Sequence, residues 1–266
     1  MSTSPRTAVV TGASSGIGAV YADRLAARGY DLLLVARRAD RLNALADKLS
    51  TAHGVKVRVL AADLAKEADL ADVEAAIQRD ASVRLLVNNA GIARLSPFAQ
   101  SSAKDAASQI ALNVTALTRL AHAVLPGFIA RNEGAVINVS SVLAVQALPI
   151  SSVYSATKAY VLQFSRGLQQ ELASTGVRVQ SVMPAATATE IWSEETSGVP
   201  LSALQKETVM SAEDLVDAAL AGFDKGEEVT WPSVGDASLW DRFDVARAAL
   251  FAATRTGTPA ARYRKA

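Results

Sequence analysis

The chain has 266 residues, of which 50% are hydrophobic and 20% charged, and its 27 basic and 26 acidic side chains leave a net charge of +1. This balance gives no electrostatic reason to expect nucleic acid or an anionic membrane as a partner. The chain has no cysteine and only two histidines. Disulfides, thiolate nucleophiles and multi-histidine metal sites are therefore excluded, and we expect no metal site.

No targeting segment is expected at the N-terminus. Residues 1–6 lead directly into a strand-like run and contain no apolar core of a signal peptide. The apolar strand-like run 32–35 is far shorter than the ~18 residues that a membrane-spanning helix needs. We therefore expect a cytoplasmic protein.

Short apolar runs alternate with amphipathic stretches along the whole chain. The pattern predicts strands over 8–10, 31–35, 55–60, 83–87, 136–139, 177–182 and 228–231. It predicts helices over 16–28, 38–50, 69–79, 106–130, 153–172 and 212–223, with Pro126 bending or closing the fourth of them. Apolar strands joined by helices indicate a parallel sheet covered on both faces. We expect an α/β fold, a doubly wound Rossmann-type sheet, in a single domain over 1–266.

Three glycines stand between the first predicted strand and the first predicted helix. Their spacing differs from the commoner G-x-G-x-x-G, but it allows the same tight turn and the same close backbone approach to a pyrophosphate. The helix N-terminus that follows offers free N–H groups to phosphates. The segment predicts a phosphate-bearing cofactor, although a purely structural turn has the same composition. The candidate contacts are Gly12, Ser14, Ser15, Gly16, Ile17 and Gly18.

Basic side chains follow the second predicted strand. An NAD site usually has an acid here for the ribose 2′-hydroxyl, whereas an arginine accommodates the 2′-phosphate of NADP. In this chain Ala36 is followed by Arg37 and Arg38. A solvated helix start is the alternative interpretation, but the helix dipole disfavours arginine at that end. The pattern favours NADP, with Arg38 competing with Arg37 for the phosphate.

Tyr154 and Lys158 are four residues apart in a predicted helix, and therefore lie on one face a turn apart. A nearby ammonium lowers the pKa of a tyrosine, which is otherwise ~10, because it favours the phenolate. Ser141 ends the fifth predicted strand, at the edge where open α/β sheets bind ligands. By spacing alone, tyrosine and lysine could be an ordinary surface pair, and Tyr160 lies in the same segment.

Several short motifs occur in a fixed order along residues 5–235. They are Thr11-Gly12-x3-Gly16-x-Gly18, Asp63-Leu64, Asn88-Asn89-Ala90-Gly91, Asn113, Ser141 and Tyr154-x3-Lys158. In this order and spacing they resemble the short-chain dehydrogenase/reductase family. The resemblance implies transfer of a hydride between a nicotinamide and a carbonyl or alcohol carbon.

The resemblance also implies a role for each matching residue. Tyr154 would be the general acid in reduction and the base in oxidation, and Lys158 would lower its pKa and bind the nicotinamide ribose. Ser141 would bind the substrate carbonyl, and Asn113 would support a water-linked proton path to Lys158. Arg37 would face the 2′-phosphate. The other implied cofactor contacts are Asp63, Leu64, Asn89, Ala90, Gly91, Pro184, Thr187 and Thr189.

One position departs from the family pattern, because Ala185 follows Pro184 where many members have glycine.

The segment 185–211 is predicted to form a lid over the substrate. Its apolar residues, with Ile191 and Trp192 as candidate substrate contacts, favour a lipophilic carbonyl compound. Apolar residues at helical spacing predict an amphipathic C-terminal extension over 236–266.

The sequence thus predicts an NADPH-dependent oxidoreductase that reduces a ketone or aldehyde to an alcohol, or catalyses the reverse reaction. The alternative is a catalytically silent NADP-binding regulatory protein, which the presence of Ser141, Tyr154 and Lys158 disfavours. The glycine spacing and the chain length disfavour a dehydratase or epimerase of related fold.

We expect the protein to form a homodimer or homotetramer, as the family resemblance implies. Helices 106–130 and 153–172 are predicted to pack against a second copy, because small residues permit close helix approach. The small residues predicted on their outer faces are Ala116, Ala123, Ala156 and Ala159.

Overall fold

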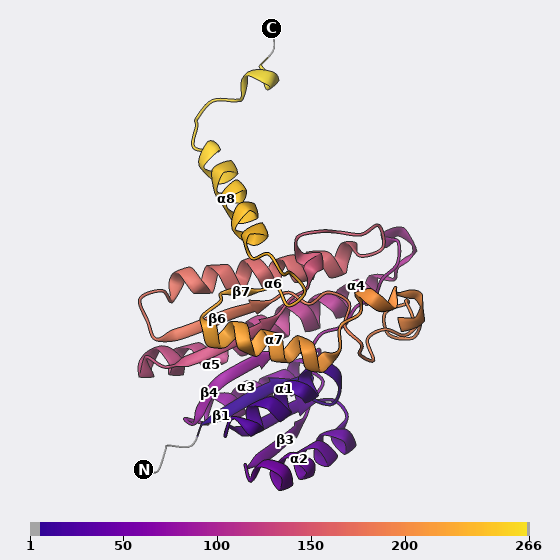
Figure 1. Ribbon diagram of the computed structural model, residues 1–266, viewed down its shortest axis with the longest axis vertical. Helices are drawn as coiled ribbons and strands as arrows, with labels where there is room; N and C mark the ends of the chain where they lie inside the picture. Colours follow the sequence, from indigo (N-terminus) through magenta and orange to yellow (C-terminus); the bar gives the residue numbers. More distant parts are fainter. Residues whose placement is uncertain (1–5, 265–266) are drawn as a thin grey trace. The chain divides into compact units, whose positions relative to one another are not determined.

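The computed structural model describes residues 6–264, within which the strands form one parallel sheet (Figure 1). The strands are β1 (Thr7–Thr11), β2 (Asp31–Ala36), β3 (Val57–Ala61), β4 (Val83–Asn88), β5 (Gly134–Val139), β6 (Val177–Val182) and β7 (Val229–Thr230). Their order across the sheet is β3-β2-β1-β4-β5-β6-β7, and neighbouring strands are parallel. The predicted doubly wound α/β fold is confirmed.

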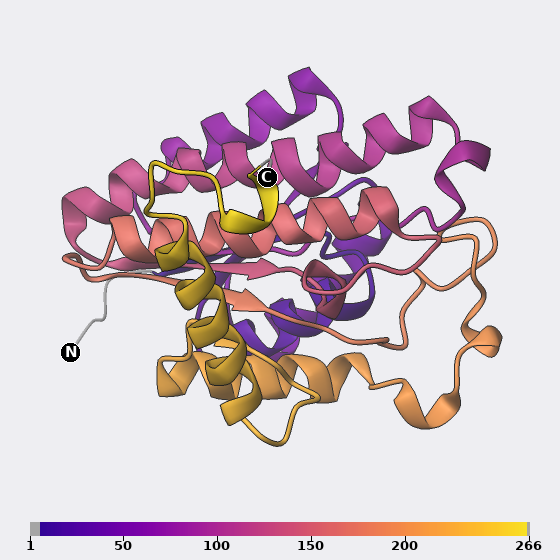
Figure 2. The same cartoon turned by 90° about the horizontal axis from the view of Figure 1, so that it is seen from above.

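Helices cover both faces of this sheet. They are α1 (Gly16–Ala27), α2 (Ala39–His53), α3 (Glu67–Gln78), α4 (Ala103–Ile110), the π-helix η2 (Ala111–Ala116), α5 (Leu117–Arg131), α6 (Ser152–Glu171) and α7 (Ala212–Lys225). One face is covered by α1, α2 and α7, and the other by α3, α5 and α6. Figure 2 shows the strands between α6 and α7. Because both faces are covered, all five residues of β1 are buried.

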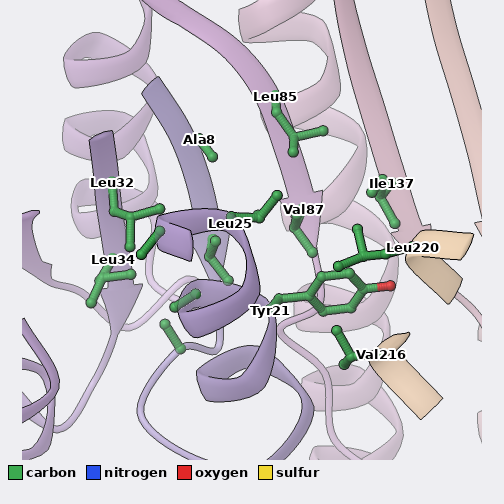
Figure 3. Close-up of a cluster of buried hydrophobic side chains, with 14 of the residues drawn as sticks. Ala8, Tyr21, Leu25, Leu32, Leu34, Leu85, Val87, Ile137, Val216 and Leu220 are labelled. Carbon is green, nitrogen blue, oxygen red and sulfur yellow. The ribbon is translucent and has the colours of Figure 1, made fainter. Parts of the chain in front are cut away.

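The core on the α1 side contains a tyrosine. Figure 3 shows the Tyr21 ring beside Val216 and Leu220 of α7. The side chain is fully buried, and its hydroxyl has no hydrogen-bond partner among the described residues. Burial raises the pKa of this phenol well above its ordinary value. Tyr21 is therefore an aromatic core residue rather than a titrating one.

The long helix predicted over 106–130 consists of α4, η2 and α5 in succession. Pro126 lies inside α5 and does not close it. The helix persists because Leu120, Val124 and Phe128 pack in the core, and such packing outweighs local propensity. By length and composition Ala103–Arg131 could cross a membrane, and 44% of its apolar window is buried in the protein.

Two of the alanines predicted on outer helix faces lie inside. Ala116 and Ala123 are buried against the sheet, so their predicted outward position is wrong. They lie at helical spacing from the core residue Leu120 and share its face. On α6, Ala156 is exposed and Ala159 is half-buried.

The chain divides into two compact units, the first ending at Pro232 and the second beginning at Ser233. The first contains the sheet. The second contains α8 (Ser238–Ala253), none of whose side chains is buried. Within it, Trp240 stacks on Phe243 with ring centroids 5.4 Å apart. The single domain over 1–266 stays a prediction.

Candidate active site

A cavity of about 530 Å³ opens at the carboxyl ends of the strands. Residues at or just after the ends of β1, β2, β4, β5 and β6 line it, as expected at the crossover point of an open α/β sheet. The predicted site residues in the lining are Gly12, Ser14, Ser15, Gly16, Ile17, Arg37, Arg38, Asp63, Leu64, Asn89, Ala90, Gly91, Ser141, Tyr154, Lys158, Pro184, Thr187, Thr189, Ile191 and Trp192. Gly18 and Asn113 do not line it.

The turn after β1 closes tightly on the end of β4. Gly12 has a φ of 68°, and a Cβ there would lie 2.7 Å from the Asn89 side chain. A Cβ on Gly18 would lie 2.3 Å from the Gly12 carbonyl oxygen. Gly18 therefore allows close packing of α1 on the turn, and this packing explains its place outside the cavity. The start of α1 reaches the cavity at Gly16, which suits a pyrophosphate.

Two polar side chains join the ends of β1 and β4. The Thr11 hydroxyl donates to the Val87 carbonyl at 3.2 Å. It accepts hydrogen bonds from the backbone N–H groups of Asn89 and Ala90, both at 3.0 Å. The Asn89 side chain donates to the Thr11 carbonyl at 2.9 Å. Asn89 therefore holds the frame of the cavity as well as lining it.

The two arginines after β2 have different surroundings. Arg38 donates to the hydroxyls of Ser14 and Ser15, with shortest distances of 3.0 and 2.7 Å. It also pairs with Glu190 at 2.7 Å. Arg37 is exposed and has no hydrogen bond or ion pair with the described residues. The Arg37 guanidinium is thus open to an anion in the cavity, whereas that of Arg38 is engaged.

Ser141, Tyr154 and Lys158 meet where β5 ends and α6 begins. Ser141 precedes a short 3₁₀ turn, where its hydroxyl accepts from the Leu143 N–H at 3.1 Å. It also acts to lower the pKa of the Tyr154 hydroxyl, against the larger effect of burial. The Lys158 ammonium lies 5.7 Å from the centre of the Tyr154 ring. It donates to the Val139 carbonyl at 2.9 Å, which fixes it at the end of β5.

Burial governs the titration of the tyrosine and the lysine. The Tyr154 ring borders the cavity and is half-buried, and desolvation raises its pKa to about 12, partly offset by the hydrogen bond with Ser141. Desolvation lowers the pKa of Lys158 to about 8. Burial thus outweighs the lowering of the Tyr154 pKa that a nearby ammonium brings.

Asn113 lies on the π-helix η2 and is buried. Its amide hydrogens are donated to the Ile92 carbonyl at 2.8 Å and to the Thr157 hydroxyl at 3.1 Å. Its oxygen accepts from the Ile92 N–H at 2.9 Å. A Cβ on Gly91 would lie 3.2 Å from that oxygen and 3.6 Å from the Lys158 nitrogen. Asn113 clamps the segment after β4, and its proton path to Lys158 stays a prediction.

A large part of the remaining cavity wall consists of apolar side chains from the segments after β4, β5 and β6. They are Ile92, Ala93, Leu95, Leu112, Val142, Leu143, Leu148, Ile191, Trp192 and Leu204. The Trp192 indole donates to the Thr187 carbonyl at 2.9 Å, which fixes the ring in the lid segment, 185–211. Among the described residues, Asn132 is the non-glycine residue that has a positive φ. Ala185 therefore does not have one. Glycine is therefore not required at position 185.

The structure distinguishes Tyr154 from its neighbour Tyr160. The Tyr160 hydroxyl is hydrogen-bonded to Thr118 on α5 at 2.9 Å, and its ring is 38% exposed and outside the cavity lining. His53 pairs with Asp23 at 3.2 Å, and His122 is exposed on α5. Neither histidine lines the cavity, so the described residues form no serine–histidine hydrolase site there.

Sequence reasoning missed several buried amides that position the site. Asn88 donates to Asn138 at 3.0 Å, and Asn138 donates to Ser165 at 2.9 Å, which joins β4, β5 and α6. Gln109 accepts from the Arg94 N–H at 3.1 Å. The sequence signal for such residues was an asparagine within an otherwise apolar strand, because a buried side-chain amide needs hydrogen-bond partners.

A protein-family model described as short chain dehydrogenase matches residues 6–199. Among solved structures, a short-chain dehydrogenase from Sphingobium yanoikuyae in complex with NADPH is 48% identical. Its TM-score is 0.93, and the match covers 97% of this chain and 100% of that one. The bulky-bulky ketone specific alcohol dehydrogenase from Comamonas testosteroni is 41% identical, with a TM-score of 0.90 and coverage of 99% and 100%.

A curated relative, the very-long-chain 3-oxoacyl-CoA reductase of Anas platyrhynchos, is 37% identical over 188 residues, or 69% of this chain. The match spans 60% of that protein's length, less than two thirds. The matched family model and the residues gathered at the cavity agree. The chain belongs to the short-chain dehydrogenase/reductase family of oxidoreductases.

Proposed function

We propose that this protein is an NADPH-dependent reductase of bulky, uncharged ketones or aldehydes. The observation that carries the substrate class is the apolar wall of the cavity. The charged residues of the lining are Arg37, Arg38, Asp63, Lys158 and Glu190, and all except Lys158 belong to the cofactor side. An anionic substrate would lack a cationic partner at the apolar wall, which is costly in a desolvated site. A bulky hydrocarbon would gain from burial against it.

The cofactor side of the cavity fits a phosphorylated dinucleotide. The tight turn at Gly12 and the start of α1 present backbone to a pyrophosphate. Ala36 at the end of β2 supplies no acid for a ribose hydroxyl, and Arg37 has an unengaged guanidinium beside it. A guanidinium matches a phosphate in charge and in bidentate geometry. These features favour NADPH over NADH.

The bound cofactor would supply the hydride, and the protein would supply the proton. The hydroxyls of Ser141 and Tyr154, which both line the cavity, would hold the substrate oxygen. With its pKa raised to about 12, Tyr154 is protonated at neutral pH and can donate to the oxygen as negative charge develops on it. The Lys158 ammonium, 5.7 Å from the ring, would stabilise the phenolate that remains.

Two structural neighbours support the proposal. The protein from Sphingobium yanoikuyae was solved with NADPH, and the enzyme from Comamonas testosteroni is described as specific for bulky-bulky ketones. Both similarities extend over nearly the whole of this chain. The similarity to the acyl-CoA reductase covers a smaller share of both proteins and carries less weight.

The proposal is tested by following reduced nicotinamide absorbance with a panel of carbonyl compounds. The panel contains diaryl ketones, small methyl ketones, 2-oxo acids and a 3-oxoacyl-CoA, each with NADPH and with NADH. We expect the highest kcat/KM for diaryl ketones with NADPH. A preference for the 2-oxo acids would overturn the substrate class. Tight NADPH binding without turnover of any compound would support the silent regulatory alternative.

A further inference from the structure

Glu190, in the lid segment, is held by two arginines. One carboxylate oxygen pairs with Arg38 at 2.7 Å and the other with Arg41 at 2.5 Å. Both arginines lie at the start of α2, directly after the strand end where an NADP site binds the 2′-phosphate. The carboxylate therefore occupies guanidinium groups that a phosphate could use.

The same cluster joins the lid segment to the turn after β1. Besides Glu190, Arg38 binds the hydroxyls of Ser14 and Ser15 in that turn. Thr189 lies against the turn as well, since a Cβ on Gly16 would be 2.9 Å from its methyl carbon. Arg38 and Glu190 both line the cavity. The ion pair between these two residues therefore holds the lid segment against the cofactor side of the cavity.

Glu190 and its two arginines are charged, but another anion can readily replace the Glu190 carboxylate. The hydrogen bonds from Arg38 and Arg41 lower the pKa of Glu190 to about 2, so the carboxylate is ionised at neutral pH. The three side chains are exposed to 53% for Glu190, 38% for Arg38 and 45% for Arg41. Ion pairs with this degree of exposure contribute little free energy, because water and salt screen them. A phosphate has three acceptor oxygens and a charge of about −1.5 to −2, and so competes effectively.

We propose that Glu190 is a specificity-determining residue that competes with the 2′-phosphate of NADPH for Arg38 and Arg41. The inference rests on the proposed preference for NADPH. A phosphorylated cofactor would bind Arg37 directly and would displace the Glu190 carboxylate from the other two arginines. NADH has no 2′-phosphate and would leave the pairing intact. Glu190 therefore weakens NADPH binding. Only a phosphorylated cofactor would break the ion pairs that hold the lid segment on the cofactor side of the cavity.

The test measures binding of two cofactor fragments by calorimetry, without turnover. The fragments are 2′,5′-ADP, which carries the 2′-phosphate, and 5′-AMP, which lacks it. Glu190→Gln keeps the shape of the side chain and removes its charge. We expect this variant to bind 2′,5′-ADP about three- to tenfold more tightly than the wild type and 5′-AMP within about twofold. Glu194→Gln makes the same charge change at an exposed position of the same segment, and should change neither affinity.

The outcomes separate this inference from the proposed cofactor preference. If wild type and Glu190→Gln both bind the two fragments equally, the NADPH preference is wrong. If the wild type prefers 2′,5′-ADP and Glu190→Gln leaves that preference unchanged, only the competition is wrong. Weaker 2′,5′-ADP binding by Glu190→Gln would also overturn it, because Glu190 would then be orienting the arginines. An equal gain in Glu194→Gln would reduce the effect to net charge and contradict a role for the pairing.

Discussion

The Lys158 ammonium lies 5.7 Å from the centre of the Tyr154 ring and donates its hydrogen bond to the Val139 carbonyl instead. The lysine is thus anchored to β5, while the tyrosine hydroxyl lines the cavity together with Ser141. Burial keeps Tyr154 protonated at neutral pH, and Lys158 places a cation near the phenolate that proton donation would produce.

Replacing Tyr154 by phenylalanine should abolish most of the activity. Phenylalanine keeps the ring packing and removes the transferable proton, so we expect kcat to fall by about 10²-fold or more while the NADPH Kd changes little. Steady-state kinetics and fluorescence titration measure the two quantities. Tyr160→Phe is the matched control, since Tyr160 lies outside the cavity lining. A Tyr154→Phe variant with more than about a tenth of the wild-type kcat would exclude Tyr154 as the proton donor.

Replacing Lys158 by methionine should stabilise the protein in the absence of cofactor while impairing catalysis. Burial lowers the pKa of Lys158 from its ordinary value of 10.5 to about 8. Below pH 8 the lysine is protonated in both folded and unfolded states, and the folded state bears the full cost of a buried charge. Between pH 8 and 10.5 the folded state releases its proton first, so wild-type stability rises with pH.

We therefore expect the free energy of unfolding of Lys158→Met to exceed that of the wild type by roughly 1–3 kcal/mol at pH 7. The difference should shrink as the pH rises from 8 towards 10.5. Urea unfolding at several pH values measures it. Lys104→Met, at an exposed position of α4, controls for the loss of a lysine. A difference that grows with pH would show that the ammonium is not destabilised by burial.

Replacing Arg37 by alanine should weaken NADPH binding and spare NADH binding. A hydrogen bond to a charged group contributes about 1.5–3 kcal/mol, so we expect the NADPH Kd to rise by roughly 10- to 150-fold. The NADH Kd should stay within about twofold, because NADH has no phosphate to lose. Titrations of both cofactors with Arg37→Ala, Arg38→Ala and the double variant measure the effect. A loss confined to Arg38→Ala would assign the phosphate to Arg38 instead.

Replacing Tyr21 by phenylalanine should leave the protein as stable or make it more stable. The buried Tyr21 hydroxyl has no hydrogen-bond partner among the described residues. Removing it relieves a desolvation cost without breaking a bond, so the free energy of unfolding should rise by about 0–1 kcal/mol. Thermal and urea unfolding measure the change. A loss of more than about 1 kcal/mol would show that the hydroxyl is satisfied in solution.

Light scattering at micromolar concentration should report a homodimer or homotetramer. The buried Ala116 and Ala123 no longer support this prediction, but the exposed Ala156 on α6 still does. Tyr160 on the same helix is 38% exposed and stacks on Phe164, with ring centroids 5.7 Å apart. Ala156→Arg should therefore shift the population towards monomer, because the larger, charged side chain prevents close helix approach. A monomeric wild type would contradict the prediction.

The fold was predictable because the strands are short runs rich in valine and leucine between turn residues. The run 177–182 coincides with β6 over its whole length. Gly12 and its neighbours were predictable as a turn because few residues tolerate the positive φ that Gly12 adopts. Pro126 does not end α5, because core packing, which local rules do not register, maintains the helix.

The parts of the site that could not be predicted depend on contacts between distant segments. Glu190 meets Arg38 across 152 positions of the chain, and no local pattern marks an acid as the partner of a particular arginine. The pKa of Tyr154 was predicted in the wrong direction for a related reason. Spacing shows that Lys158 is near, but only the packed structure shows how strongly the surroundings desolvate the phenol.

The π-helix η2 has a consequence for insertions and deletions. A π-helical turn holds an extra residue relative to an α-helical one, so it offsets the faces of α4 and α5 against each other. Deleting one residue there would restore a continuous α-helix and rotate α4 by about 100° relative to α5. Gln109 would then turn away from the Arg94 backbone that it binds. This segment should therefore tolerate substitutions better than any change in its length.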